Sequence, residues 1–263
     1  MRTIWKGTIS FGLVSIPIRL FSGARRQNVK FNMLHEKCQT RIKYRYYCPR
    51  CDETVDYKET VRGYEYEKGR YMVVTDEEMK DLAAEQNRRI ELVDFIELSD
   101  IDPIYYDSTY YVMPGEAGRK PYALLTEAMT EASRVGIGRF VMRRKPHLVA
   151  LRPKRGALVM ETMFYAEEIR NLESIKQEVG GVPPRDQSVD DKEKRMAVEL
   201  IETLSAEFAP ENYRNEYRDR VLNYIEKKAA GEEVVVPEEE PAEVIDLMDA
   251  LQESLERAQT KVE

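Results

Sequence analysis

The first 165 residues alternate apolar and polar side chains over short stretches separated by turn-forming residues. The alternation from Ile9 to Leu20, centred on Pro17, predicts two short strands near a bend. Tyrosines and β-branched residues recur between residues 40 and 74, so we expect short hairpins there. Thr75 and the three acids that follow it are typical of the first turn of a helix.

Further strands are expected up to about residue 164, with a helix over Tyr122–Arg134 among them. Many short strands with few helices indicate a β-barrel or a sandwich rather than a parallel βαβ sheet. The strands that we expect are Ile90–Leu98, Tyr105–Met113, Ile137–Arg143, Leu148–Leu151 and Ala157–Phe164.

Beyond residue 165 the pattern becomes helical. Apolar spacing predicts helices over Lys192–Phe208 and from about Glu211 to Ala229. Glycines and prolines predict a linker over 180–184, and acidic residues with prolines predict another over 232–241. A last helix over about 242–259 carries an apolar stripe that either folds back on the protein or docks in a groove of a partner. The residues of this stripe are Val244, Ile245, Leu247, Met248, Leu251 and Leu255.

Charge is distributed unevenly along the 263 residues, although the net charge is −7. Residues 1–160 contain 28 basic and 21 acidic side chains, whereas residues 161–263 contain 13 and 27. Among the first fifty residues there are 11 basic groups and one acid, Glu36. The asymmetry, rather than the acidic total, indicates which partners the chain can bind.

The basic clusters are interleaved with strand-type residues, which favours contact with a phosphate backbone over an ordinary solvated face. Alternation on a strand would place Arg41, Lys43 and Arg45 on one face. No helix-turn-helix pattern is present, so we expect contacts that do not read bases. The candidate DNA-binding residues are Arg25, Arg26, Lys30, Lys37, Arg41, Lys43, Arg45, Arg50, Arg139, Arg143 and Arg144.

Cysteine spacing gives a second candidate site. His35-x-x-Cys38 is followed, after nine residues, by Cys48-x-x-Cys51. Two ligand pairs with short internal spacing suit a closed, tetrahedral, structural Zn²⁺ site. The alternative is a cysteine pair on a turn beside an ordinary polar histidine. Three cysteines form no disulfide framework, which favours a cytoplasmic protein. Binding to DNA would make it nucleoid-associated.

Enzyme motifs are not recognised in the sequence. No phosphate loop, dinucleotide fingerprint or Gly-x-Ser-x-Gly motif occurs, and only two histidines are available for acid–base work. Carboxylates are plentiful, so a metal-dependent nuclease acting at DNA ends stands as an alternative function. No apolar run reaches the ~20 residues of a membrane-spanning helix.

Three stretches together resemble the bacterial Ku family of DNA-end-binding proteins: Trp5–Pro17, Gly63–Tyr66 with Tyr71–Asp76, and Asp102–Tyr106. The resemblance covers about residues 1–230 and returns in Val244–Leu251. It implies a mainly β fold with some α: a β-barrel core, a bridging segment and a helical C-terminal arm. Residues 1–180 would form the core and bridge, 181–231 the arm, and 232–263 an acidic linker with a partner-binding helix.

The same resemblance implies a function in non-homologous end joining. Two identical chains would pair into a ring that threads the end of a double-stranded DNA and recruits a multifunctional ATP-dependent DNA ligase. Members of the family are not themselves catalytic. A general, chromatin-type DNA coater is a third possibility, which would bind closed circles as well as it binds ends.

Overall fold

The computed structural model describes residues 2–25, 27–75, 77–79, 88–142, 145–178, 190–231 and 247–262. The chain divides into two compact units. The first contains residues 1–26 and 32–171, and the second contains residues 27–31 and 172–263. Among the described residues, no helix is both long and apolar enough to span a membrane.

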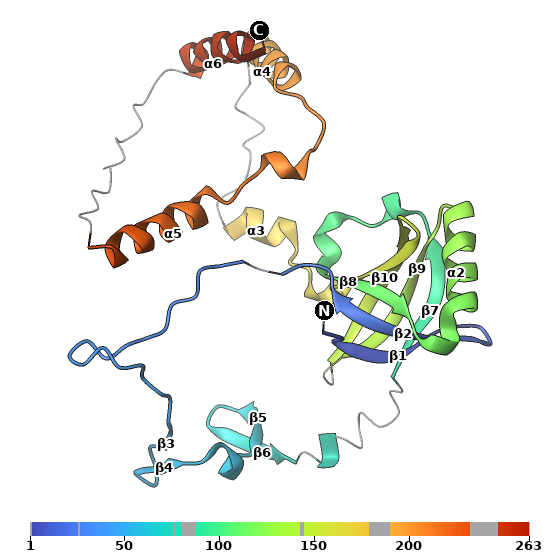
Figure 1. Cartoon of the computed structure of the whole chain (residues 1–263), viewed down its shortest axis with the longest axis vertical. Helices are drawn as coiled ribbons and strands as arrows, with labels where there is room; N and C mark the ends of the chain where they lie inside the picture. Colours follow the sequence, from blue (N-terminus) through green and yellow to red (C-terminus); the bar gives the residue numbers. More distant parts are fainter. Residues whose placement is uncertain are drawn as a thin grey trace. The chain divides into compact units, whose positions relative to one another are not determined.

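Seven strands of the first unit close into a barrel, and the predicted β-barrel core is therefore confirmed (Figure 1). Neighbouring strands run antiparallel except for β1 and β7, which pair in parallel. In order around the barrel they are β1 (Trp5–Phe11), β2 (Val14–Ser22), β8 (Tyr106–Pro114), β11 (Ala157–Met163), β10 (Lys145–Lys154), β9 (Val135–Met142) and β7 (Arg89–Ile96).

The bend expected near Pro17 lies instead between β1 and β2, where Gly12 has a φ of +53°. Glycine adopts this left-handed conformation without a steric cost. Pro17 lies inside β2, one residue beyond the point where the β2–β8 ladder ends at Ile18. Its carbonyl accepts a bond from the Gly115 N–H at 2.8 Å, and its missing N–H removes no bond from the ladder.

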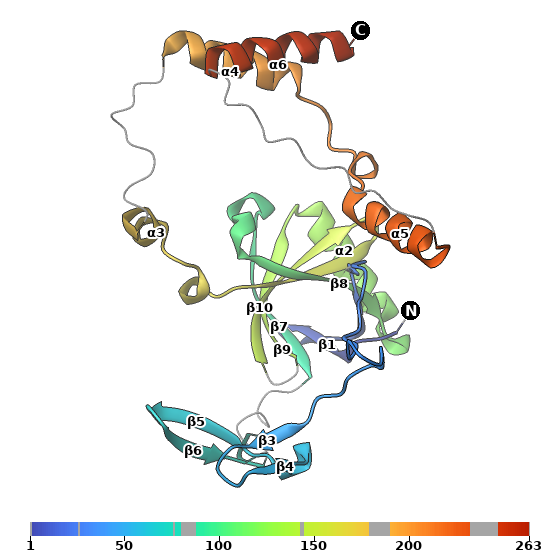
Figure 2. The same cartoon turned by 90° about the vertical axis from the view of Figure 1, so that its left-hand side faces the viewer.

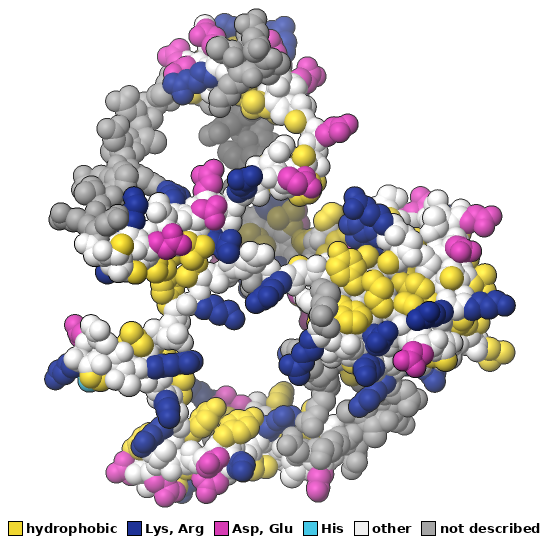
Figure 3. Space-filling view, in the orientation of Figure 1, with side chains coloured by type: hydrophobic (Ala, Val, Ile, Leu, Met, Phe, Trp, Pro, Cys, Tyr) yellow, Lys and Arg dark blue, Asp and Glu magenta, His cyan; other side chains and the backbone are white. Residues whose placement is uncertain are grey.

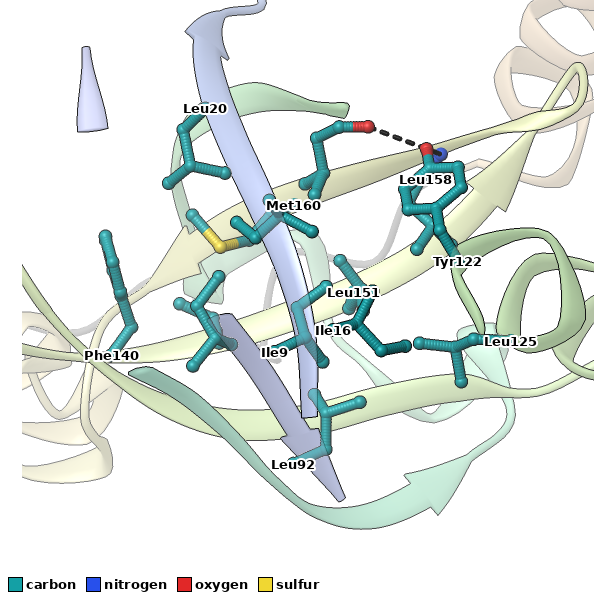
Figure 4. Packing of buried hydrophobic residues seen from close by; sticks show 14 of the residues in the cluster. Ile9, Ile16, Leu20, Leu92, Tyr122, Leu125, Phe140, Leu151, Leu158 and Met160 are labelled. Carbon is teal, nitrogen blue, oxygen red and sulfur yellow. Dashed lines mark hydrogen bonds between the residues drawn. The ribbon is translucent and has the colours of Figure 1, made fainter. Parts of the chain in front are cut away.

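The barrel interior is filled by alternate residues of the strands, among them Ile9, Leu151 and Met160, which have no exposed surface. The helix α2 (Arg119–Glu131) packs against this core through Tyr122, Leu125 and Met129 (Figure 4). Burial of each such side chain contributes about 1.5–3 kcal/mol. The first unit is therefore held together by the barrel and α2.

An insertion between β2 and β7 carries two separate hairpins, β3 (Tyr46–Cys48) with β4 (Glu53–Val55), and β5 (Arg62–Glu67) with β6 (Arg70–Val74). None of residues 27–75 is buried. A hairpin outside a core is marginally stable in water. The insertion thus contrasts with the barrel, because its own packing supplies almost none of its stability.

Thr75 begins the helical turn that the sequence predicts. The Glu78 N–H donates to Thr75 Oγ1 at 3.2 Å, and the Glu78 carboxylate accepts the Thr75 N–H at 2.8 Å. This reciprocal pair is a capping box. The remainder of the predicted helix lies outside the described residues.

The described residues of the second unit form the helices α3 (Leu172–Glu178), α4 (Asp191–Thr203), α5 (Glu216–Ala229) and α6 (Leu247–Val262). α6 packs along α4, as Figure 2 shows. α4 ends five residues before the predicted end. α5 begins later than predicted because Asn215 caps it, accepting the Arg218 N–H at 2.9 Å.

Short 3-10 turns link these elements. They lie at Tyr57–Glu59, Leu98–Asp100, Pro103–Tyr105, Glu116–Gly118, Ala166–Glu168 and Pro210–Asn212.

Candidate nucleic-acid interface

The insertion presents a long basic segment that is nearly free of acids. Residues 27–50 contain six Lys or Arg and one acid, Glu36. Figure 3 shows Lys and Arg side chains spaced along the insertion rather than gathered in one spot. The described candidate residues are all exposed, namely Arg25, Lys30, Lys37, Arg41, Lys43, Arg45, Arg50 and Arg139. The other three candidates, Arg26, Arg143 and Arg144, lie outside the described residues.

The exposed cations are free of acidic partners within the described part of the chain. None of them forms an ion pair there, whereas Arg70 pairs with Glu67 and Arg134 with Glu97, both at 3.0 Å. An unpaired cation in solvent keeps its full capacity to neutralise a phosphate and release a counterion. The segment is therefore suited electrostatically to a nucleic-acid backbone.

The structure corrects the placement of Arg41, Lys43 and Arg45 on one strand face. Residues 42–45 lie in no strand, and Arg41 pairs only through an isolated bridge with Leu34. The alternating sequence is typical of a strand, but this stretch has no neighbouring strand among the described residues to supply the ladder bonds. Arg139 is separate from this group, on the outward face of β9, in register with Glu91 on one side and Leu148 on the other.

Arg152, a basic residue of the barrel, is paired within the protein and is not available to bind a phosphate. Arg152 donates from Nε and Nη2 to one carboxylate oxygen of Glu161, at 3.0 and 2.8 Å. The register sets Arg152 opposite Val159 and Glu161 opposite Ala150, so the charged pair lies diagonally across β10 and β11. The Glu161 side chain is 8% exposed and Arg152 is 25% exposed. Arg152 is therefore neutralised within the barrel, although neighbouring basic residues in the sequence are surface cations.

Exposed aromatic and aliphatic side chains accompany the cations. Tyr44 is 83% exposed and Phe31 74% exposed. On β5–β6, Tyr64 lies opposite Met72 on one face, and Gly63 opposite Val73 and Glu65 opposite Tyr71 on the other. Each face therefore carries exposed apolar side chains, and the second face also carries a carboxylate. Figure 3 shows such hydrophobic side chains open to solvent in this region. The enrichment in tyrosine correctly predicts strands in this region. It does not reveal that these strands pack against no core, because tyrosine is common both in buried and in exposed strands.

The candidate metal ligands form two separate pairs. His35 Nδ1 lies 3.1 Å from Cys38 Sγ. Cys48 and Cys51 interact at the turn between β3 and β4, where backbone N–H groups of Cys51 and Arg50 lower the pKa of Cys48. The hydrogen bond between the free Cys51 and Cys48 thiols raises the pKa of Cys51. Among the residues described, no three His, Cys, Asp or Glu side chains converge on one metal position.

The predicted partner-binding stripe is only partly described. Met248, Leu251 and Leu255 are half-buried on α6, the helix that packs along α4. The side chain of Leu247 and all of Val244 and Ile245 lie outside what the structure describes. Over its described length α6 packs along α4, and these three side chains each keep part of their surface exposed. Docking of the stripe on a partner stays a prediction.

α4 itself exposes apolar residues, which the sequence pattern does not distinguish from core residues. On α4, Ile201 is 66% exposed and Val198 46%, and Leu204, which caps the C-terminus of α4, is 64% exposed. Their three-residue spacing places them along one side of a helix. The sequence shows the helical periodicity of α4. It does not show which side of α4 is covered by α6.

Comparison with known proteins identifies the family. The family model for Ku, described as the Ku70/Ku80 beta-barrel domain, matches residues 10–196. A protein of Heliobacterium modesticaldum named non-homologous end joining protein Ku is 43% identical over 99% of this chain and 94% of its own length. A Bacillus subtilis protein of the same name is 42% identical over 98% of this chain and 82% of its own.

A relative from Symbiobacterium thermophilum, also named non-homologous end joining protein Ku, is longer. It is 43% identical over 99% of this chain, which spans 64% of that protein. The barrel topology, the matched family model and the relatives' near-complete coverage of this sequence agree with the resemblance carried by the opening Trp5–Pro17 stretch. The chain belongs to the Ku family.

Proposed function

We propose that the chain binds the ends of double-stranded DNA, without reading sequence, as a homodimer that serves non-homologous end joining. The observation that carries this proposal is membership of the Ku family, whose relatives are named for that pathway. The exposed, unpaired cations of residues 27–50 supply the electrostatic basis. They lie on an insertion in which none of the described residues 27–75 is buried.

Sequence-independent binding follows from the chemistry of the exposed groups. Lys and Arg side chains on extended backbone reach phosphate oxygens, which carry no sequence information. Each phosphate contact steepens the dependence of log K on log salt concentration by about 0.9. We therefore expect affinity to fall strongly with salt and to vary little with base composition.

A second copy of the chain is the partner that the insertion requires. Exposed apolar side chains lie on both faces of β5–β6, among them Tyr64, Met72 and Val73, and DNA offers phosphates rather than an apolar surface to cover them. A two-fold pair would bury matching hairpins and present the basic segment twice. Two chains paired in this way would form the ring that threads a DNA end.

Recruitment of an ATP-dependent DNA ligase is assigned to the second unit. Residues 161–263 contain 27 acids against 13 basic groups, which disfavours DNA and leaves this region for protein contacts. The exposed Val198 and Ile201 on α4, with Leu204 directly after it, give a ligase an apolar surface, and α6 packs along the same helix. The protein acts here as a scaffold rather than as an enzyme.

The proposal is tested by comparing linear DNA with a closed circle of equal length and sequence. A ring that threads ends binds the linear form more tightly, whereas a general coater binds both equally. Incubating end-labelled linear DNA with Mg²⁺ or Mn²⁺ tests the nuclease alternative, because a scaffold leaves the label intact and a nuclease releases it.

A further inference from the structure

Exposed tyrosines lie among the cations of the insertion, and the stacked bases of a duplex offer their rings no free face. We propose that Tyr46 and Tyr57, with Tyr44 before them, stack on the unpaired bases of a single-stranded overhang at a DNA end. This inference rests on the proposed binding of DNA ends, because it extends that binding from the duplex to the strand that protrudes from it.

Cations and rings alternate in this part of the sequence. Residues 41–50 contain four Lys or Arg and no acid. Tyr44 stands between Lys43 and Arg45, and Tyr46 follows Arg45 directly. A single strand of DNA repeats in the same way, since every nucleotide carries one phosphate and one base. Cations combined with aromatic rings are typical of proteins that bind single strands without sequence preference.

Two of the rings form one exposed platform. The ring centroids of Tyr46 and Tyr57 lie 5.7 Å apart, with an angle of 40° between the ring planes. Tyr46 is 54% exposed and Tyr57 is 67% exposed, so much of each ring is open to solvent. Aromatic surface of this kind accepts any base, because every base has a flat π face.

The backbone fixes the platform on both sides. Tyr46 lies in β3, in register with Val55 of β4. Tyr57 begins a 3-10 turn that is closed by a capping box, in which the Asp56 N–H donates to the Glu59 carboxylate at 2.7 Å. Rings that are already held in place lose less conformational entropy when a ligand stacks on them.

Tyr44 lies in the chain just before β3. It is 83% exposed, and its hydroxyl makes a weak bond to Met33 Sδ at 4.0 Å. Lys43 and Arg45, on either side of it, are exposed and form no ion pair within the described part of the chain. This ring can therefore take a base while its neighbours take the adjacent phosphates.

Tyr47 differs from these three residues although it follows Tyr46 directly. It pairs with Thr54, on the opposite face of the hairpin from Tyr46 and Val55. Its hydroxyl donates to the Asp52 carboxylate, and this bond is the main cause that raises the pKa of Tyr47. A carboxylate beside the ring repels phosphates, so we assign no base to Tyr47.

The test compares three DNAs with one common duplex, using the full-length protein at one salt concentration. One DNA ends bluntly, one carries a single-stranded overhang, and one carries an overhang of equal length made of abasic sugar-phosphate units. The two overhangs have the same number of phosphates, so the ratio of their affinities measures the contribution of the bases. We expect the overhang with bases to bind about fivefold to a hundredfold more tightly for each base stacked.

Substitutions assign this ratio to the platform. Tyr46→Ser with Tyr57→Ser should bring the ratio close to one, whereas Tyr46→Phe with Tyr57→Phe should keep it, because a phenyl ring still stacks. The matched control Tyr47→Ser removes a tyrosine of similar exposure from the other face of the hairpin and should also keep the ratio. Tyr44→Ser should lower the ratio, and it changes no residue of β3 or β4.

A ratio near one in the parent protein, or an undiminished ratio in the protein with Tyr46→Ser and Tyr57→Ser, would overturn the proposal. A shift of that double variant from dimer to monomer would also overturn it, because the rings would then belong to the contact with a second chain. The blunt duplex tests the proposed function separately. Binding to blunt ends without any effect of the bases would refute only the stacking, whereas failure to bind blunt ends would contradict the proposed function.

Discussion

A single buried hydroxyl connects α2 to two strands of the barrel. Tyr122 donates its O–H to the Val112 carbonyl at 2.6 Å and accepts the Leu158 N–H at 2.7 Å (Figure 4). Burial is the main cause that raises the pKa of Tyr122 above its ordinary value of 10.0. The phenol therefore stays neutral and keeps both bonds over the whole physiological range.

Tyr122→Phe should destabilise the barrel by about 1–3 kcal/mol, because it leaves a buried carbonyl and a buried N–H unpaired. Urea unfolding followed by circular dichroism measures the change. Tyr213→Phe, at a side chain 70% exposed, is the control and should stay within about 0.5 kcal/mol. Equal stability of the Tyr122→Phe and parent proteins would show that these bonds contribute nothing net.

Two cations of the insertion give the second residue-scale prediction. Lys43→Gln with Arg45→Gln should reduce the salt slope of log K for DNA by about 0.9 for each phosphate that the parent side chains neutralise. Arg257→Gln on α6, where Arg257 pairs with Glu253, is the matched control and should leave the slope unchanged. Titrations at several salt concentrations measure it, and an unaltered slope in the double variant would remove both residues from the interface.

At the scale of elements, alternation in the sequence predicted the barrel strands closely, because each has one face in the core. The same reasoning was wrong for residues 41–45, since alternation alone does not supply a neighbouring strand. Strand register explains why the sequence did not reveal that Arg152 is paired. The Arg152–Glu161 pair spans β10 and β11, and only the strand pairing reveals that this arginine is already neutralised. The exposed stripe on α4 depended likewise on knowing which side α6 covers.

The α4–α6 pair makes a prediction about ligase recruitment. Ile201→Glu should weaken stimulation of an ATP-dependent ligase without changing DNA binding, because Ile201 is 66% exposed on α4 and away from the basic insertion in sequence. Leu124→Glu on α2, at 67% exposure, is the matched control. Deleting residues 242–263 should give the same phenotype as Ile201→Glu and also loosen α4.

Ligation assays with matched amounts of each protein distinguish the outcomes. Loss of DNA binding on the deletion would show that α6 supports the interface itself. Full stimulation by the Ile201→Glu protein would place the ligase contact elsewhere.

At the scale of the whole molecule, the barrel is self-sufficient and its insertion is not. Exposed Tyr64 and Met72 lie opposite each other on β5–β6, and we expect a second chain to cover them. Tyr64→Ser with Met72→Ser should shift sedimentation from dimer toward monomer. Tyr213→Ser, which removes an equally exposed tyrosine from the second unit, should remain dimeric. A parent protein that is monomeric at micromolar concentration would contradict the two-fold ring.

The central claim is that the protein requires a free DNA end. The most direct measurement compares its affinity for one linear duplex with open ends, the same duplex with both ends blocked by a bulky protein, and the closed circle, all at one salt concentration. The account predicts tight binding to the open linear form and weak binding to the other two. Equal affinity for all three would contradict it and leave a general DNA coater in its place.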